Sequence, residues 1–219
     1  MKAGVITFPG SNCDRDIQTI LQDFFDIPTD MIWHGDSISN SYDLLIVPGG
    51  FSYGDYLRAG AIARFAPAMQ DLIKHAQKGG YVLGICNGFQ ILCESHLLPG
   101  ALIRNQNLKH ICKDVDLIPD GANQVFGRLQ GPLSIPVSHG EGNYRVDHEV
   151  LKELQDNGQI AFRYARNPNG SIDDIAGITS KDGKIMGMMP HPERATDPIN
   201  GKLQGKAILQ SILESMQVA

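Results

Sequence analysis

Residues 81–93 read Tyr-Val-Leu-Gly-Ile-Cys-Asn-Gly-Phe-Gln-Ile-Leu-Cys, and two periodicities meet within them. The apolar run Tyr81–Ile85 has the length and composition of a buried strand, and from Asn87 the apolar spacing is helical. Cys86 stands at the change between two flanking glycines, as in the Gly-x-nucleophile-x-Gly elbow with cysteine in place of serine. A helix N-terminus favours thiolate over thiol. Cys86 is therefore a candidate nucleophile, and on this stretch alone a structural cysteine is the alternative.

Strands and helices alternate around this elbow. Buried strands are expected at Ala3–Phe8, Thr29–Trp33, Asp43–Val47, Tyr81–Ile85 and Ile185–Met189. Helices are expected over 17–25, 59–76, 147–155 and 203–212, and Pro67 must kink or split the second of them. The alternation predicts an α/β fold with a mostly parallel, doubly wound sheet flanked by helices. In such a sheet the catalytic and binding residues lie at the carboxyl ends of the strands.

The sequence pattern changes over residues 103–143, where turn-forming residues become frequent. Short strands are expected at Ile111–Ile118, Val125–Leu129 and Ser134–Val137, followed by Ile160–Tyr164 and Ile175–Thr179. This pattern indicates a small antiparallel excursion in the second half of the chain. Because no linker marks a boundary, we expect a single domain over residues 1–219.

Composition excludes several classes of protein. The net charge is −5 without a Lys/Arg run, which argues against nucleic acid as a ligand. No apolar run approaches the ~20 residues of a membrane span, and no signal peptide is recognisable, so a cytoplasmic location is expected. Four cysteines in 219 residues do not make a disulfide framework. We expect Cys13, Cys93 and Cys112 to be buried small residues rather than reactive thiols.

Two His-x-Glu pairs compete to supply the base that a cysteine nucleophile needs. His191 directly follows the strand that ends at Met189, so topology places it at the carboxyl edge of the sheet with Cys86. Prolines on both sides restrict its backbone, and Glu193 could orient its ring. His139, with Glu141, lies in the turn-rich region and is the weaker candidate. A metal site built from both pairs is not expected, because neither has helical ligand spacing.

The stretch Pro48-Gly-Gly-Phe51 follows a buried strand and offers unobstructed backbone N–H groups. Together with the N–H of Asn87, it could form a hole for a tetrahedral oxyanion. The alternative is a glycine turn that merely ends the strand.

Read together, Gly84-Ile-Cys-Asn-Gly-Phe-Gln90, Pro48-Gly-Gly and His191-Pro-Glu193 resemble the class I, triad-type glutamine amidotransferase family, whose sheet is flavodoxin-like. Four further stretches are similar to the stand-alone glutaminase subunits of phosphoribosylformylglycinamidine synthase. They are Pro9-Gly-Ser-Asn-Cys-Asp-Arg-Asp16, Pro48-Gly-Gly-Phe-Ser-Tyr-Gly-Asp-Tyr-Leu-Arg58, Ser138-His-Gly-Glu-Gly-Asn-Tyr144 and Met189-Pro-His-Pro-Glu-Arg194.

The resemblance implies a role for each matching residue. Cys86 would be the nucleophile, His191 the base and Glu193 its orienter, while Gly50 and Asn87 would supply the oxyanion donors. Contacts to the substrate glutamine would come from Gln90 and from the loop Ser138, His139, Gly140 and Glu141. The resemblance also implies a synthetase partner and a small third subunit. It implies no cofactor on this chain, with ATP and Mg²⁺ on the synthetase.

Three alternatives remain open at this stage. One is an amidotransferase subunit of the same fold that serves pyridoxal phosphate, histidine or tetrahydrofolate-linked synthesis. Another is a non-enzymatic cysteine sensor or chaperone with the same elbow, which would form no thioester. A cysteine peptidase would need an extended substrate groove, for which the sequence offers no feature.

Overall fold

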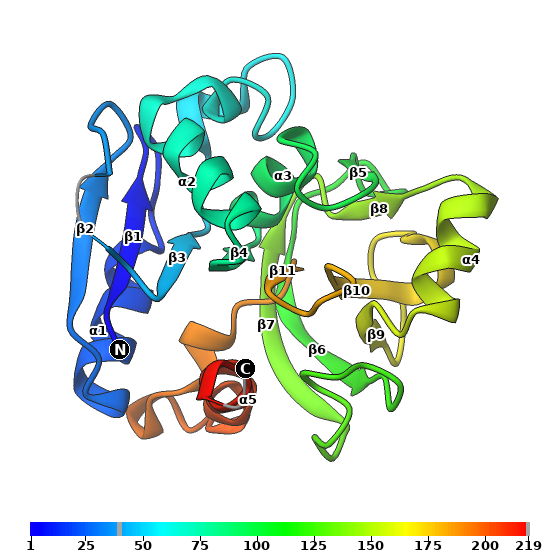
Figure 1. Cartoon of the computed structure of the whole chain (residues 1–219). Coiled ribbons are helices and arrows are strands. Elements are labelled where there is room, and N and C mark those ends of the chain that lie inside the picture. Colours follow the sequence, from blue (N-terminus) through cyan, green and yellow to red (C-terminus); the bar gives the residue numbers. More distant parts are fainter. Residues whose placement is uncertain (39–40, 218–219) are drawn as a thin grey trace. The chain divides into compact units, whose positions relative to one another are not determined.

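The computed structural model describes residues 1–38 and 41–217, which fall into two compact units (Figure 1). The first unit comprises Met1–Leu98 and Lys184–Gly187, and the second comprises Pro99–Gly183 and Met188–Ala219. A single domain over residues 1–219 stays a prediction.

The first unit contains strands in the order β2-β1-β3-β4-β11. These strands are β1 Ala3–Thr7, β2 Thr29–Trp33, β3 Leu44–Val47, β4 Tyr81–Ile85 and β11 Ile185–Met188. The pairs β1–β2, β1–β3 and β3–β4 are parallel. An order of 2-1-3-4 is that of flavodoxin-like sheets. The predicted α/β fold with a mostly parallel sheet is confirmed.

Helices α1 (Asp14–Phe25), α2 (Pro67–Gln77) and α3 (Asn87–Glu94) belong to the same unit. Pro67 splits the helix expected over residues 59–76, because it lacks an N–H and takes the first position of α2. Before it, only a short 3-10 turn at Ala63–Phe65 forms. The buried faces of α1 and α2 carry apolar residues at helical spacing, as the sequence predicts.

The second unit contains the antiparallel strands β10-β9-β6-β7. Their bounds are β6 Ile111–Pro119, β7 Leu133–His139, β9 Ile160–Tyr164 and β10 Ile175–Thr179. A separate pair joins β5 (Ala101–Ile103) to β8 (Asn143–Arg145). The antiparallel part is thus larger than the small excursion that the sequence indicates.

The strand expected at Val125–Leu129 is wrong. The side-chain oxygen of Asn123 accepts hydrogen bonds from the N–H groups of both Val125 and Phe126. The backbone carbonyl of Asn123 accepts one from the N–H group of Gly127. A local turn of this kind, held by an asparagine side chain, competes with strand pairing. Val125 and Phe126 are buried nevertheless, which explains why the pattern resembles that of a strand.

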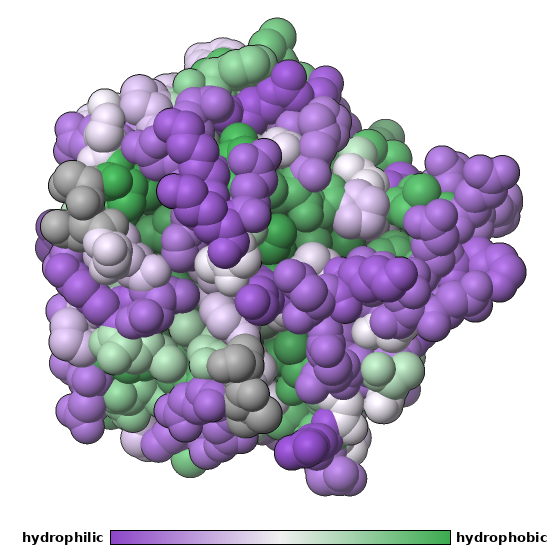
Figure 2. Space-filling model, viewed as in Figure 1, coloured by the Kyte–Doolittle hydropathy of each residue, from purple (hydrophilic) through white to green (hydrophobic). Residues whose placement is uncertain are grey.

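Helices α4 (His148–Asp156) and α5 (Gln204–Gln217) complete the second unit. The Asp147 side chain caps α4 by accepting the N–H of Val150 at 2.8 Å. Only Leu154 of α4 is buried, and the surface over this helix is hydrophilic in Figure 2. Within residues 1–38 and 41–217, no helix is both long and apolar enough to cross a membrane.

Candidate active site

Cys86 is the single residue between β4 and α3, and its backbone is strained. Its φ of 51° and ψ of −105° are unusual for a residue with a side chain, at a cost of about 1–3 kcal/mol. The flanking glycines permit the turn. A Cβ on Gly88 would lie 1.9 Å from the Val47 carbonyl oxygen, and one on Gly84 would lie 2.8 Å from the Gly88 carbonyl group. The sequence Gly-x-Cys-x-Gly therefore forms a tight elbow that only glycine allows.

Gly50 lies three residues after the end of β3 and closely approaches the loop after β1. Its φ is 151°, and a Cβ there would lie 2.6 Å from the Gly10 carbonyl oxygen. The N–H of Phe51 donates to that same Gly10 oxygen at 2.8 Å. The Gly49 carbonyl oxygen, in the same peptide group as the Gly50 N–H, accepts the N–H groups of Asn12 at 3.3 Å and Cys13 at 3.2 Å, which holds this peptide group in place.

The Asn87 side chain links this loop to the first turn of α3. Its Oδ1 accepts the N–H of Ser52 at 3.1 Å, and its Nδ2 donates to Gln90 Oε1 at 2.9 Å. A longer bond of 3.4 Å reaches Asp55 Oδ1. Gly50, Cys86, Asn87 and Gln90 are thus carried by one unit, on segments joined by buried hydrogen bonds.

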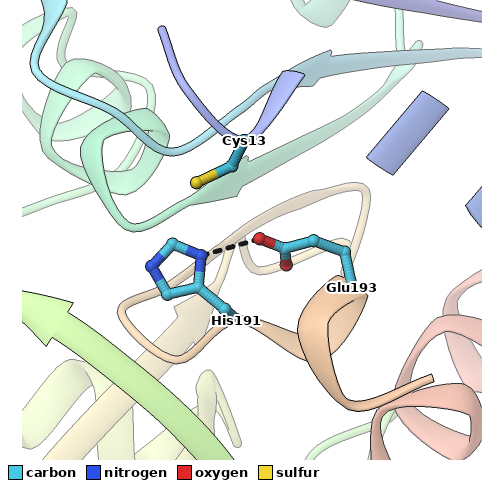
Figure 3. Close-up of side chains that lie close together, drawn as sticks. All are labelled: Cys13, His191 and Glu193. Atoms are coloured by element: carbon cyan, nitrogen blue, oxygen red, sulfur yellow. Dashed lines mark hydrogen bonds and ion pairs between the residues drawn. The ribbon is translucent and has the colours of Figure 1, made fainter. Parts of the chain in front are cut away.

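The His191–Glu193 pair is formed within the second unit. His191 Nδ1 bonds to Glu193 Oε1 at 2.7 Å, and both side chains are almost fully buried (Figure 3). The 3-10 turn Pro192–Ala195 brings the two together, and the His191 N–H donates to the Pro136 carbonyl at 2.9 Å. A carboxylate at Nδ1 holds the proton there, which leaves Nε2 of the neutral ring as the basic nitrogen.

His139, the competing base, ends β7 and is also buried. Its pKa is lowered to about 4, chiefly by burial and to a smaller extent by the nearby imidazoles of His191 and His110. Its Nδ1 lies 3.1 Å from Asn105 Oδ1. An imidazole of so low a pKa is a weak base near neutral pH, which favours His191 for that role.

The loop that begins at Ser138 is held by residues on the segment before β6. Ser138 Oγ bonds to His110 Nε2 at 3.0 Å, and Glu141 lies 3.9 Å from Arg104. The Gly140 carbonyl accepts the N–H of Asn105 at 2.9 Å. Sequence reasoning missed Asn105, which lies in a polar stretch without a motif and is 34 positions from its partner His139.

The remaining cysteines behave differently from one another. Cys13 and Cys93 are buried, as expected, and burial raises the pKa of the Cys93 thiol far above its usual range. Cys112 is exposed, so the expectation of a buried residue is wrong. It follows the buried Ile111 in β6, and alternation along a strand turns its side chain to the opposite face. Within the described residues, no disulfide links any of the four cysteines.

Residues 1–211 match the model of the CobB/CobQ-like glutamine amidotransferase domain, and the chain belongs to this family. Within this family, the chain is highly similar over its full length to proteins of one kind. The chain is 55% identical over 219 residues to phosphoribosylformylglycinamidine synthase subunit PurQ of Leptospira interrogans, covering 98% of this chain and all of that one. It is 53% identical over 220 residues to the subunit of the same name from a Nostoc species, covering 99% and 98%.

Solved structures show the same relationship. A chain of the Thermotoga maritima PurLQS structure superposes with a TM-score of 0.86 at 40% identity, over 98% of both chains. A glutamine amidotransferase from the same organism superposes with a TM-score of 0.65 at 19% identity, over 99% and 97% of the two chains, which shows the shared fold.

Proposed function

We propose that this chain is the glutaminase subunit of phosphoribosylformylglycinamidine synthase. It hydrolyses glutamine to glutamate and ammonia and passes the ammonia to a synthetase subunit. That subunit uses ATP to convert formylglycinamide ribonucleotide into formylglycinamidine ribonucleotide, in purine synthesis. Full-length identities of 53% and 55% to subunits named for this enzyme support the assignment.

The observation that carries the chemistry is the strained elbow at Cys86. A φ of 51° between a buried strand and a helix is retained at an energetic cost, and such strain concentrates at functional sites. Of the buried cysteines, Cys93 lies inside α3 with a raised pKa, which suits packing rather than reaction. We therefore assign the nucleophile to Cys86.

In the first step, Nε2 of His191 takes the proton of the Cys86 thiol. The resulting thiolate attacks the side-chain amide carbon of glutamine, and the C=O electron pair moves onto oxygen. Backbone N–H groups of Gly50 and Asn87 stabilise this oxyanion. Losing one such donor typically costs about 3 kcal/mol of transition-state stabilisation. Gln90 contacts the substrate one helical turn beyond Cys86.

In the second step, the imidazolium of His191 gives its proton to the departing nitrogen, and the C–N bond breaks. Ammonia leaves, and a γ-glutamyl thioester remains on Cys86. His191 then takes a proton from water, which attacks the thioester and releases glutamate and the thiolate. Glu193 keeps the ring oriented throughout. The loop Ser138, His139, Gly140 and Glu141 holds the amino-acid end of the substrate.

Ammonia delivery explains why a partner is needed. Free ammonia near pH 7 is mostly protonated, and ammonium has no lone pair with which to attack. A shielded route to a docked synthetase avoids this loss. We propose that the assembly also includes a small third subunit, that it works in the cytoplasm, and that ATP and Mg²⁺ bind to the synthetase. This chain itself is proposed to need neither cofactor nor metal.

The test is to measure glutaminase turnover with and without the synthetase, ATP and formylglycinamide ribonucleotide. We expect weak turnover alone, strong stimulation in the full mixture, and one formylglycinamidine ribonucleotide formed for each glutamate released. Stimulation by the synthetase of another glutamine-dependent pathway, and none by this one, would contradict the assignment of the partner. Absence of glutamine hydrolysis in every mixture would contradict the amidotransferase activity itself.

A further inference from the structure

Both polar atoms of the Asn105 side chain form hydrogen bonds that hold the Ser138–Gly142 loop and the segment before β6. Its Nδ2 donates to the carbonyl oxygens of Lys109 at 2.8 Å and His139 at 2.9 Å. Its Oδ1 accepts the N–H of Gly142 at 3.0 Å and faces Nδ1 of His139 at 3.1 Å. The residue is completely buried.

These partners fix which way the Asn105 amide points. A flipped amide would set its oxygen against two carbonyl oxygens and its NH₂ group against the N–H of Gly142. Oδ1 therefore faces His139, and an amide oxygen can only accept a hydrogen bond. It follows that Nδ1 of His139 carries the hydrogen.

The other ring nitrogen of His139 is then an acceptor. His139 is buried, and Nε2 has no hydrogen-bond partner among the described residues. A buried polar atom without a partner costs free energy and requires an explanation. The ring is also closely enclosed, because a Cβ on Gly142 would lie 2.3 Å from it. A small N–H donor that arrives with a ligand would satisfy this atom.

We propose that Asn105 is a positioning residue that locks His139 in its Nδ1–H tautomer, so that Nε2 accepts a hydrogen bond from an N–H group of the substrate. This inference rests on the proposed function. Glutamine carries two such donors, the α-ammonium group and the side-chain amide. Glu141, three residues beyond Ser138 in the same loop, adds a carboxylate that suits the cationic donor.

The charged and titratable groups around His139 agree with a neutral ring. Burial is the main cause of its lowered pKa, and electrostatic interaction with the neighbouring His191 and His110 lowers it as well. The pair formed by Arg104 and Glu141 lies on the adjoining segments. With a pKa of about 4, His139 keeps its Nε2 lone pair throughout the neutral range and cannot take the proton of an ammonium group.

The first experiment reads the tautomer directly and needs no activity. Nitrogen-15 NMR of the full chain, with the His139 signals assigned through His139→Gln, should show a protonated Nδ1 and a bare Nε2 near pH 7. A protonated Nε2 would overturn the proposal even if glutaminase activity is present. Failure of the proposed function would instead appear as absent activity in the wild-type complex, with this signature intact.

The second experiment uses kinetics in the complex with the synthetase. His139→Leu removes the acceptor, and we expect KM for glutamine to rise about tenfold or more with kcat within about twofold. His139→Gln keeps an acceptor oxygen and should restore much of the loss. An unchanged KM in His139→Leu would overturn the proposal. A glutamine analogue without the α-amino group identifies the donor: its KM is insensitive to His139→Leu if the ammonium group is bound, and sensitive if the amide is.

The third experiment tests Asn105 itself. Asn105→Asp replaces a neutral acceptor by a carboxylate, which raises the pKa of His139 and places a hydrogen on Nε2. We expect KM for glutamine to rise as pH falls from 8 to about 6 in this variant and to stay level in wild type. A pH-independent KM in Asn105→Asp, with a melting temperature showing that it is folded, would contradict the positioning role.

Discussion

Cys86 combines a reactive side chain with a backbone conformation that few residues adopt. Its φ of 51° is tolerated because both neighbouring segments hold it: β4 is a buried strand, and α3 is fixed through the Asn87 side chain. Strain of this kind costs about 1–3 kcal/mol, and glycine would relieve it. The residue is therefore selected for its sulfur and not for stability.

This strain leads to a prediction about stability. Cys86→Gly and Cys86→Ala both remove the sulfur, but only glycine adopts a positive φ without strain. We expect Cys86→Gly to be more stable than Cys86→Ala by about 1 kcal/mol, after allowing for the greater chain entropy of unfolded glycine. Urea denaturation of the two variants measures the difference. Greater stability of the alanine variant would show that the backbone here is unstrained.

The hydrogen bond of 2.7 Å between His191 and Glu193 leads to a prediction about turnover. In Glu193→Gln the amide can donate to Nδ1, which favours the tautomer with a hydrogen on Nε2 and removes the base. We expect kcat to fall by about 10²–10⁴-fold with a small change in KM. Steady-state glutaminase assays of the complex measure this. Wild-type kcat in Glu193→Gln would argue against Glu193 as the orienting group.

At the scale of elements, the elbow depends on how closely α3 approaches β3. The Gly88 position leaves no room for a side chain, since a Cβ would lie 1.9 Å from the Val47 carbonyl oxygen. The glycine after the nucleophile thus serves helix-strand packing. It also places the first turn of α3, with Asn87 and Gln90, beside the loop that follows β3.

Gly88→Ala should therefore destabilise the protein by about 2 kcal/mol or more, because backbone must shift to admit the methyl group. Gly121→Ala is the matched control, since a Cβ there meets nothing within 4 Å. Thermal or urea unfolding compares both with wild type. Equal stability of the two variants would mean that α3 can move away from β3 at little cost.

An element can be predicted from the sequence where local composition determines it, and less well where a specific side-chain contact does. Strands such as Leu44–Val47 and Tyr81–Ile85 are buried apolar runs, and their composition alone identifies them. The segment Val125–Leu129 begins with two apolar residues as a strand would, but it is turned by one asparagine side chain. Pro67 was predicted to interrupt a helix, and its covalent geometry makes that outcome independent of tertiary context.

In the candidate site, too, local contacts could be predicted from the sequence and long-range contacts could not. Glu193 is two positions from His191, and a local turn brings them together, so their pairing could be predicted from the sequence. Asn105 and His139 are 34 positions apart, and their bond depends on how β5, β7 and β8 are arranged. No periodicity or motif in a single sequence encodes that contact.

At the scale of the whole molecule, partly and fully buried histidines make stability depend on pH. Burial lowers the pKa of His34, His75 and His139, the last to about 4. Below the ordinary pKa near 6.5, the unfolded chain binds protons that the folded chain does not. The stabilisation is complete above that value and, for His139, is lost as pH falls through the window from about 6.5 to 4.

We expect the free energy of unfolding to drop by about 2 kcal/mol between pH 7 and pH 5 through His139 alone. His139→Gln cannot bind a proton there and should lose correspondingly less over the same interval. Urea denaturation of both proteins at the two pH values gives the comparison. Parallel losses in wild type and variant would show that His139 is not a buried neutral histidine.

The central claim is that Cys86 forms a thioester with the help of His191, and active-site labelling tests it most directly. A chloroketone analogue of glutamine is added to the complex, and the modified cysteine is identified by peptide mass spectrometry. The account predicts modification of Cys86 alone, protection by glutamine, and much slower labelling in His191→Ala with His139→Ala as the comparison. Modification of Cys13, Cys93 or Cys112 instead, or a rate that His191→Ala leaves unchanged, would contradict it.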